Sequence, residues 1–351
     1  MRHTLYRQRG FSLVELMVAM GLSLLLLAGA VSVLYSTRLT YTENERLARI
    51  QEAGRTTIEI ISRDARASGF AGCNRLDPDK FDNVLDDDTS LLWNFQERIY
   101  GFEATGGGWD PALDADLTPD ASADSDILLL RTSRQGLPVF RTVASTLDPT
   151  AAISIRREPG QAVTPGQTMV ISDCEYTSVF VATDMVDGGA ADLATIEHGT
   201  DVVSATKAVN EFDSVTANFK IDALVTPVDT VIYYVRPMAA GEGPGLWQKI
   251  GAEDPQLLVE GVENMQIRFG VDTDNNLVVN EYVTADDVDA GDNWGNVISI
   301  SIAILVRSDQ ETGVELDGGT YDLLGTVLGP FNDRRQRSIY TTTIALRNGA
   351  T

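Results

Sequence analysis

Hydrophobic and polar residues follow two different periods, which divide the chain into a helical start and a β-rich remainder. From Phe11 to Tyr35 the only charged residue is Glu15. A helix of this length spans about 37 Å, enough to cross a hydrocarbon core of about 30 Å. Beyond this run, apolar and small residues recur at spacings of three and four, which place them on one helical face. We therefore predict one helix from about residue 13 to 67, with this stripe packed against the rest of the protein: Leu47, Ile50, Gly54, Ile58, Ile61 and Ala65.

The remainder of the chain carries strand signals. Residues 74–126 are rich in Asp, Gly and Pro, and we expect long surface loops there, with short helical pieces around residues 91–100. Further on, short runs alternate apolar and polar residues, which predicts antiparallel sheets with one covered face. A helix followed by strands is an α+β architecture, in which region 127–220 is a candidate for a separate lobe. The strands are expected near residues 127–131, 139–143, 169–172, 179–183, 230–236, 265–271, 298–306 and 340–346.

Charge separates the same two parts. The chain has 351 residues and a formal net charge of -24. Residues 1–70 hold nine arginines and six acidic residues, a net charge of +3, whereas residues 71–351 hold 18 basic and 45 acidic residues, a net charge of -27. An acidic body repels nucleic acid and anionic lipid head groups, which argues against a nucleic-acid function. The ordinary interpretation of such a surface is solubility.

Glu15 distinguishes three interpretations of the N-terminal segment, which begins with four basic residues within positions 2–9. A secretory signal peptide has an apolar core and a small-x-small cleavage site, which residues 28–30 provide. A plain membrane anchor is the second interpretation. A leader cut on the cytoplasmic side, between Gly10 and Phe11, is the third. An acid in the membrane costs roughly 2.5–3.5 kcal/mol, and only the third interpretation supplies a partner, because cleavage creates a positively charged amino group on Phe11.

The stretch Arg-Gly-Phe-Ser-Leu-Val-Glu-Leu over residues 9–16 resembles the class III signal of type IV pilins and type II secretion pseudopilins. The resemblance implies that prepilin peptidase cuts the Gly10–Phe11 bond and that the amino group of Phe11 is then methylated. It also implies that Glu15 is needed for assembly. Cleavage by signal peptidase after Ala30 is the rival, and it predicts a mature chain that starts at Val31.

Residues 258–272, 297–308 and 340–348 resemble the PilW-type minor pilins, as do two short segments around the cysteines, residues 69–73 and 172–174. The related type II secretion pseudopilins are usually shorter. The resemblance implies a leader (1–10), a transmembrane and filament-core helix (11–35), its extramembrane half (36–68) and a β-rich body with long acidic loops (69–351).

The resemblance also implies what such a protein does and where. It is a single-pass protein of the cytoplasmic (inner) membrane with its body in the periplasm, which then enters an extracellular pilus. It helps to prime pilus assembly near the tip and so supports adhesion, twitching motility or DNA uptake. The implied partners are other minor and major pilins, prepilin peptidase, the inner-membrane assembly platform and a tip adhesin. A pseudopilin that serves protein export is the alternative, and a membrane-anchored ligand-binding module is a third class that leaves Glu15 unexplained.

Cys73 and Cys174 are the two cysteines of the chain. In the implied location both lie outside the cytoplasm, where thiols are usually joined. We therefore expect a disulfide between them, with two buried free thiols as the alternative.

One loop has the spacing of calcium ligands. Asp272, Asp274 and Asn276 fit positions one, three and five of a calcium-binding loop. Position six is Leu277 instead of glycine and position twelve is Val283 instead of glutamate. The alternative is a polar hairpin turn, where Asp and Asn are common. Calcium is the only cofactor that the sequence suggests.

Catalytic patterns are missing from the sequence. The two histidines are His3 in the leader and His198 in a polar stretch, where we expect it on the surface. No zinc spacing, nucleophile elbow or Cys/His pair is present, so we expect a structural protein and no enzyme.

Overall fold

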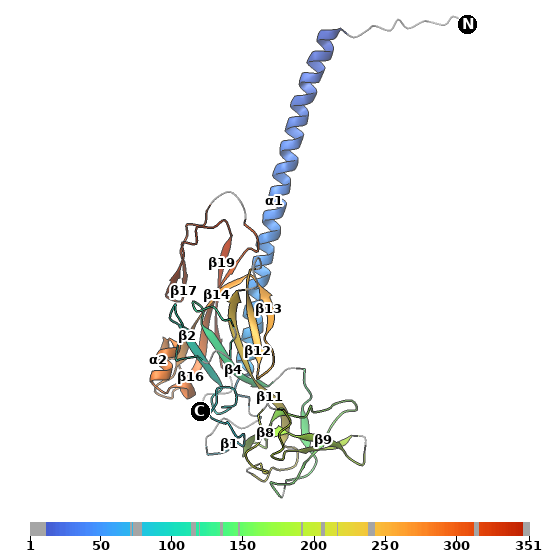
Figure 1. Cartoon of the computed structure of the whole chain (residues 1–351), viewed down its shortest axis with the longest axis vertical. Helices are drawn as coiled ribbons and strands as arrows, with labels where there is room; N and C mark the ends of the chain where they lie inside the picture. The colour runs from blue at the N-terminus through green and yellow to red at the C-terminus, as the bar shows by residue number, and fades with distance from the viewer. Residues whose placement is uncertain are drawn as a thin grey trace, which may run out of the picture. The chain divides into compact units, whose positions relative to one another are not determined.

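The computed structural model describes residues 12–70, 72, 79–113, 117–118, 120–133, 136–146, 148–190, 192–204, 208–215, 217–237, 243–311 and 316–346. The chain forms two compact units, residues 1–49 and 50–351. Their element order is one long helix followed by strands (Figure 1), which confirms the α+β prediction.

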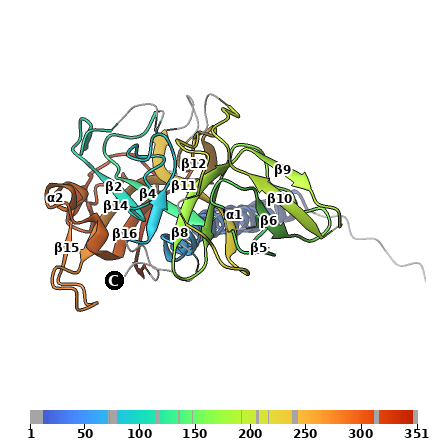
Figure 2. The same cartoon turned by 90° about the horizontal axis from the view of Figure 1, so that it is seen from below.

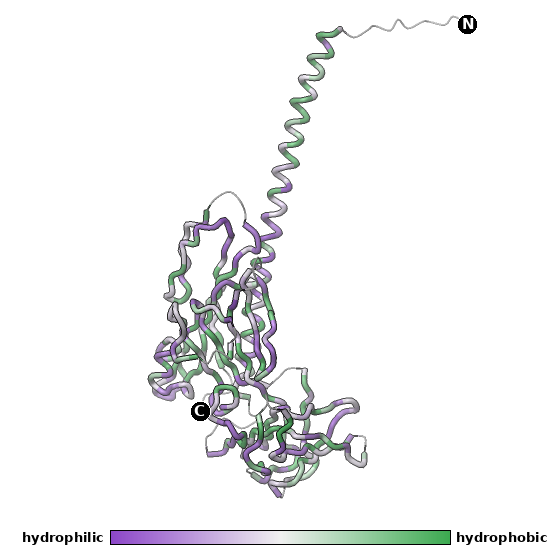
Figure 3. Tube along the Cα trace, viewed as in Figure 1, coloured by the Kyte–Doolittle hydropathy of each residue, from purple (hydrophilic) through white to green (hydrophobic). Residues whose placement is uncertain are grey.

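The predicted helix is present as α1 (Leu13–Ala67). In the first unit its side chains are largely exposed, and apolar residues dominate its early turns (Figure 3). In the second unit one face is buried, and it includes the predicted Ile50, Gly54, Ile61 and Ala65. Leu47, the first residue of the predicted stripe, is 39% exposed.

A 13-stranded sheet forms most of the body, and its central strand is the 14-residue β11. The first part of β11 pairs with β5 and β7, and its later part pairs with β4 and β12. Among the described strands of this sheet, β1 and β8 pair in parallel and the other pairs are antiparallel. The strands are β1 (Phe81–Asn83), β2 (Ile99–Ala104), β3 (Trp109–Asp110), β4 (Ile127–Ser133), β5 (Phe140–Thr142), β6 (Ile153–Arg156), β7 (Gln167–Ser172), β8 (Thr177–Ala182), β9 (Asp184–Asp187), β10 (Leu193–Glu197), β11 (Leu224–Pro237), β12 (Pro244–Ile250) and β13 (Gln256–Glu260).

A second, four-stranded sheet has the order β15-β14-β16-β19. β19 alternates less and more exposed residues, as the period of two predicts. β14 and β16 are buried on both faces, so the expectation of one covered face is wrong for them. A two-stranded hairpin and two short helical segments complete the body. The elements are β14 (Val262–Val271), β15 (Glu281–Val283), α2 (Ala285–Ala290), the 3-10 helix η1 (Trp294–Asn296), β16 (Val297–Arg307), β17 (Tyr321–Leu323), β18 (Thr326–Leu328) and β19 (Arg337–Ala345).

Two apolar clusters form the larger cores of the body. The main core joins α1 to β4, β11, β12, β14, β16 and β19. The second lies among β5, β6, β7, β8 and β10. Figure 2 shows β6, β9 and β10 on one side of the body and β14, β16 and α2 on the other. The region 127–220 therefore has a core of its own from β5 onward, but its first strand, β4, packs in the main core.

Two expectations about local structure are wrong. Residues 91–100 contain turns followed by the start of β2, without a helix. β11 begins at Leu224, six residues before the expected strand, and it continues through Pro227 without a break. Pro227 lies in the gap between the β5 pairing, which ends at Val225, and the β12 pairing, which begins at Val231. A proline in such a gap costs the sheet little.

Candidate assembly site

The start of α1 has the properties that a membrane or filament core requires. The helix is apolar and long enough to cross a bilayer, and its apolar window is exposed throughout. Glu15 lies in the first turn, where its backbone N–H donates hydrogen bonds to the carbonyl (3.1 Å) and hydroxyl (3.2 Å) oxygens of Ser12. Carboxylates near a helix N-terminus are favoured by the helix dipole. Gly10 and Phe11, the predicted cleavage site, lie outside the described residues.

Polar contacts fix the far half of α1 to the body. The Tyr233 hydroxyl of β11 donates a hydrogen bond to Asp64 Oδ2 (2.6 Å) and accepts one from Gln248 Nε2 (2.8 Å). Burial and the adjacent Asp64 carboxylate raise the pKa of Tyr233, so this hydroxyl stays protonated. Just past the helix, the Gly69 N–H donates to the Arg131 carbonyl (2.8 Å). These hydrogen bonds therefore attach the C-terminal end of α1 to β4 and β11.

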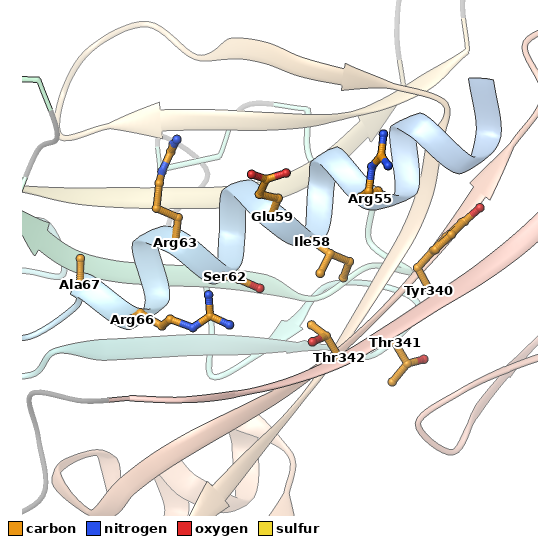
Figure 4. Close-up of a pocket in the computed structure, with 10 residues that line it drawn as sticks. All are labelled: Arg55, Ile58, Glu59, Ser62, Arg63, Arg66, Ala67, Tyr340, Thr341 and Thr342. Atoms are coloured by element: carbon orange, nitrogen blue, oxygen red, sulfur yellow. The ribbon is translucent and has the colours of Figure 1, made fainter. Parts of the chain in front are cut away.

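A groove runs between α1 and β19 (Figure 4). Its volume is about 820 Å³, and it is lined by α1 residues and by three residues of β19, Tyr340, Thr341 and Thr342. At one end α1 approaches β19 closely, because Gly54 has no side chain. A Cβ atom at this position would collide with the Tyr340 ring. The α1 residues of the groove are Arg55, Ile58, Glu59, Ser62, Arg63, Arg66 and Ala67.

A buried arginine holds the segment that follows β16. The Arg337 side chain is 1% exposed and forms ion pairs with Glu263 (2.6 Å), Asp317 (2.9 Å) and Asp333 (2.7 Å). Its guanidinium also lies 3.8 Å from the centre of the Phe331 ring. Burial acts to lower the pKa of Arg337, but hydrogen bonds to Asp333 and Glu263 outweigh it and raise that pKa. We did not expect this cluster, because its acids lie up to 74 residues away in sequence.

The loop predicted to bind calcium is a hydrogen-bonded turn. Asp272 accepts hydrogen bonds from the backbone N–H groups of Asp274 (3.3 Å), Asn276 (3.2 Å) and Leu277 (2.7 Å). Burial acts to raise the pKa of Asp272, and these bonds more than offset it and lower that pKa. These contacts are those of a polar turn, and calcium at Asp272, Asp274 and Asn276 stays a prediction. Absence of heat when millimolar calcium is titrated into the protein would remove it.

His198 is not on the surface as expected. It is 4% exposed, its Nε2 lies 3.1 Å from the Ala151 carbonyl oxygen, and its ring meets Phe180 edge-on. Within the described ranges, no group of three or more His, Cys, Asp or Glu side chains is placed to hold a metal. Cys174 follows β7 with a positive φ of 72°, and Cys73 lies outside the described residues, so their pairing stays a prediction.

Two family models match the chain. Residues 232–348 match Type IV Pilus-assembly protein W, a segment that runs from within β11 to just beyond β19. Residues 5–31 match the Prokaryotic N-terminal methylation motif, which includes Gly10, Phe11 and Glu15. No curated protein and no solved structure matches the chain. The matches confirm the resemblance to PilW, point to a structural pilin more than to an enzyme, and support a type IV pilus minor pilin anchored in a membrane through α1.

Proposed function

We propose that this protein is a minor pilin that helps to prime and promote assembly of a type IV pilus. It acts near the pilus tip and so supports adhesion, twitching motility or DNA uptake. The observation that carries the proposal is the presence on one chain of an N-terminal methylation motif and a PilW match over residues 232–348.

The chemistry of assembly follows from the N-terminal residues. Prepilin peptidase cleaves between Gly10 and Phe11, which leaves a positively charged amino group that is then methylated. In a bundle of parallel helices, Glu15 of one subunit pairs with the amino group of Phe11 on its neighbour. The pair offsets the cost of an acid in an apolar environment, roughly 2.5–3.5 kcal/mol for an isolated one.

The location follows from the same residues. Positive charge ahead of the apolar run keeps the leader in the cytoplasm. Residues 11–35 then span the cytoplasmic membrane, and the acidic body folds in the periplasm before the subunit enters the pilus. Its partners are the other minor and major pilins, the assembly platform in the inner membrane and a tip adhesin.

Replacement of Glu15 tests the pairing. Glu15→Ala should still insert and be cleaved, so its mature N-terminus begins at methylated Phe11, but it should not enter sheared pili. Glu45→Ala is the matched control, because Glu45 lies on the same helix and pairs locally with Arg49 (2.8 Å). Assembly of Glu15→Ala at the wild-type level would contradict the pairing, and a mature chain that starts at Val31 would contradict the leader.

Deletion of the gene separates the pilus from secretion. The proposal expects few pili and little twitching in the deletion strain, with both restored by the wild-type gene. Intact pili and twitching would contradict a priming role. Intact pili together with loss of protein export would favour the alternative, a minor pseudopilin of a type II secretion system, as would secretion genes beside this one.

We further infer that Cys73 and Cys174 form a disulfide. A Cβ atom built on Gly72 would lie 2.7 Å from Ser172 Cβ, so the residue before Cys73 lies against the end of β7, two residues before Cys174. Alkylation of the unfolded protein without reductant should add no mass, whereas prior reduction should allow two additions. Labelling without reductant would indicate free thiols.

A further inference from the structure

The last strand of the body lies at the edge of its sheet. β19 is nine residues long and pairs with β16 from Arg337 opposite Arg307 to Ala345 opposite Ser299. Among the described strands β19 has no second neighbour. One side of its backbone is therefore open.

The open side can be assigned to individual residues. The Leu346 N–H donates to the Ile298 carbonyl (2.9 Å), and the Gln336 carbonyl accepts from the Ser308 N–H (2.9 Å). The backbone N–H and C=O groups of the even-numbered residues of β19 thus point toward β16. Because the backbone groups of an antiparallel strand alternate in direction, those of Thr341 and Thr343 point outward.

β19 lacks the features that usually protect an edge. Residues 338–345 read Ser-Ile-Tyr-Thr-Thr-Thr-Ile-Ala, with no charge and no proline. Two other edge strands are short and charged: β9 has four residues with Asp at both ends, and β15 has three and begins with Glu281. Long, uncharged edges invite a further strand, and proteins normally cover or charge them.

The groove beside this edge is cationic. Figure 4 shows Ile58, Ser62 and Arg66 on the flank of α1 nearer to Thr342. The α1 wall has three arginines and one glutamate, in a protein whose body is otherwise strongly acidic. Within the described part of the chain, Arg55 and Arg66 have no ion-pair partner. Figure 4 shows Arg55, Glu59 and Arg63 extending from the flank away from Thr342, so a side chain of an added strand that faced α1 would meet Arg66 first.

We propose that β19 and the facing side of α1 bind an extended acidic strand of another protein chain. The strand adds to the sheet through the outward backbone groups of Thr341 and Thr343, and an acidic side chain of the strand lies toward Arg66. This partner surface goes beyond assembly through Glu15 and does not depend on it. The occupant is acidic, because the charged residue on the facing flank is Arg66 and the α1 residues of the groove carry a net positive charge.

Binding of designed peptides to the purified full-length chain in detergent tests the proposal. The probes are two fluorescent nine-residue peptides that alternate valine or threonine with glutamate in one and with lysine in the other. The glutamate peptide should bind about tenfold more tightly than the lysine peptide, by anisotropy at low salt. Hydrogen exchange should slow at the amides of Thr341 and Thr343 and stay unchanged at Thr342, which already faces β16.

Two variants separate the backbone from the charge. Thr341→Pro removes an outward N–H and leaves the β16 pairing intact, so it should weaken binding about tenfold with an unchanged Tm. Arg66→Glu should remove the preference for the glutamate peptide, whereas Arg156→Glu, an exposed change on β6, should keep it. No binding of the glutamate peptide, or equal binding by Thr341→Pro, would overturn the proposal. Self-association that Thr341→Pro abolishes would also overturn it, because the occupant would then be a second copy.

Discussion

Replacement of Arg337 by methionine should destabilise the body more than any other single loss of charge in this region. Methionine keeps much of the buried volume but removes the cation that Glu263, Asp317 and Asp333 share. Glu263 then keeps only Arg307, and Asp333 keeps only a longer contact to Arg335 (4.0 Å). These carboxylates are 14%, 11% and 25% exposed, so water screens them only in part. Removal of one member of such a buried cluster typically costs about 3–5 kcal/mol.

The matched control is Arg307→Met. Arg307 also pairs with Glu263 (2.8 Å), but it is 20% exposed and contacts no other acid of the cluster. Glu263 keeps Arg337 in this variant. We therefore expect a loss of about 1 kcal/mol.

Thermal unfolding of the full-length chain in detergent, followed by tryptophan fluorescence, measures both variants. At about 2 °C per kcal/mol for a body of this size, Arg337→Met should lower the Tm by about 6–10 °C and Arg307→Met by about 2 °C. Adding Asp333→Asn to Arg337→Met should recover part of the loss, because it removes one of the carboxylates that shared Arg337. Equal shifts for the two single variants would refute the reasoning, since burial and the number of partners would then not determine the cost.

Three further predictions concern stability. Hydrogen bonding to Arg337 lowers the pKa of Asp333 to about 2, below its unfolded value near 4. Up to about 2 kcal/mol of stability is therefore present above pH 4 and lost as the pH falls toward 2. Asp333→Asn should flatten this part of the profile of Tm against pH, and an unchanged profile would contradict the assignment. Cys174→Ser should lower the free energy of unfolding by up to about 4.7 kcal/mol in oxidising buffer and have much less effect under reductant; equal effects in both buffers would argue against the disulfide. Gly54→Val should cost about 1–3 kcal/mol because a side chain there meets the Tyr340 ring, whereas Gly189→Val, in open space, should be neutral in the same urea titration.

The elements that could be predicted from the sequence are those whose signal is local. The stripe on α1 repeats at the helical period, and the residues that it placed inward, such as Ile50 and Ile61, are buried. β14 and β16 alternate over ten or more residues, so their type and approximate limits were clear. The leader is recognisable for a similar reason, since Gly10, Phe11 and Glu15 lie within six residues of one another.

The features that could not be predicted depend on residues far apart in the chain. His198 stands in a polar stretch, and only packing against Phe180 and the Ala151 carbonyl makes it a buried residue. The partners of Arg337 come from three separate segments. The groove between α1 and β19 also joins distant segments, although the lack of charge over residues 338–345 is visible in the sequence.

The shared strand β11 has a mechanical consequence for the body. The second core is joined to the main one through the backbone of β11, which pairs with β4 over Val228–Tyr233 and with β12 over Val231–Pro237. A pull on the second core along β11 therefore loads both ladders together, parallel to the strands, so that many hydrogen bonds must break at once. The resistance of the body to such a pull is governed by the rate at which these hydrogen bonds rupture, not by the equilibrium stability. Traction on that part of the body would reach α1 through the hydrogen bond from Tyr233 to Asp64.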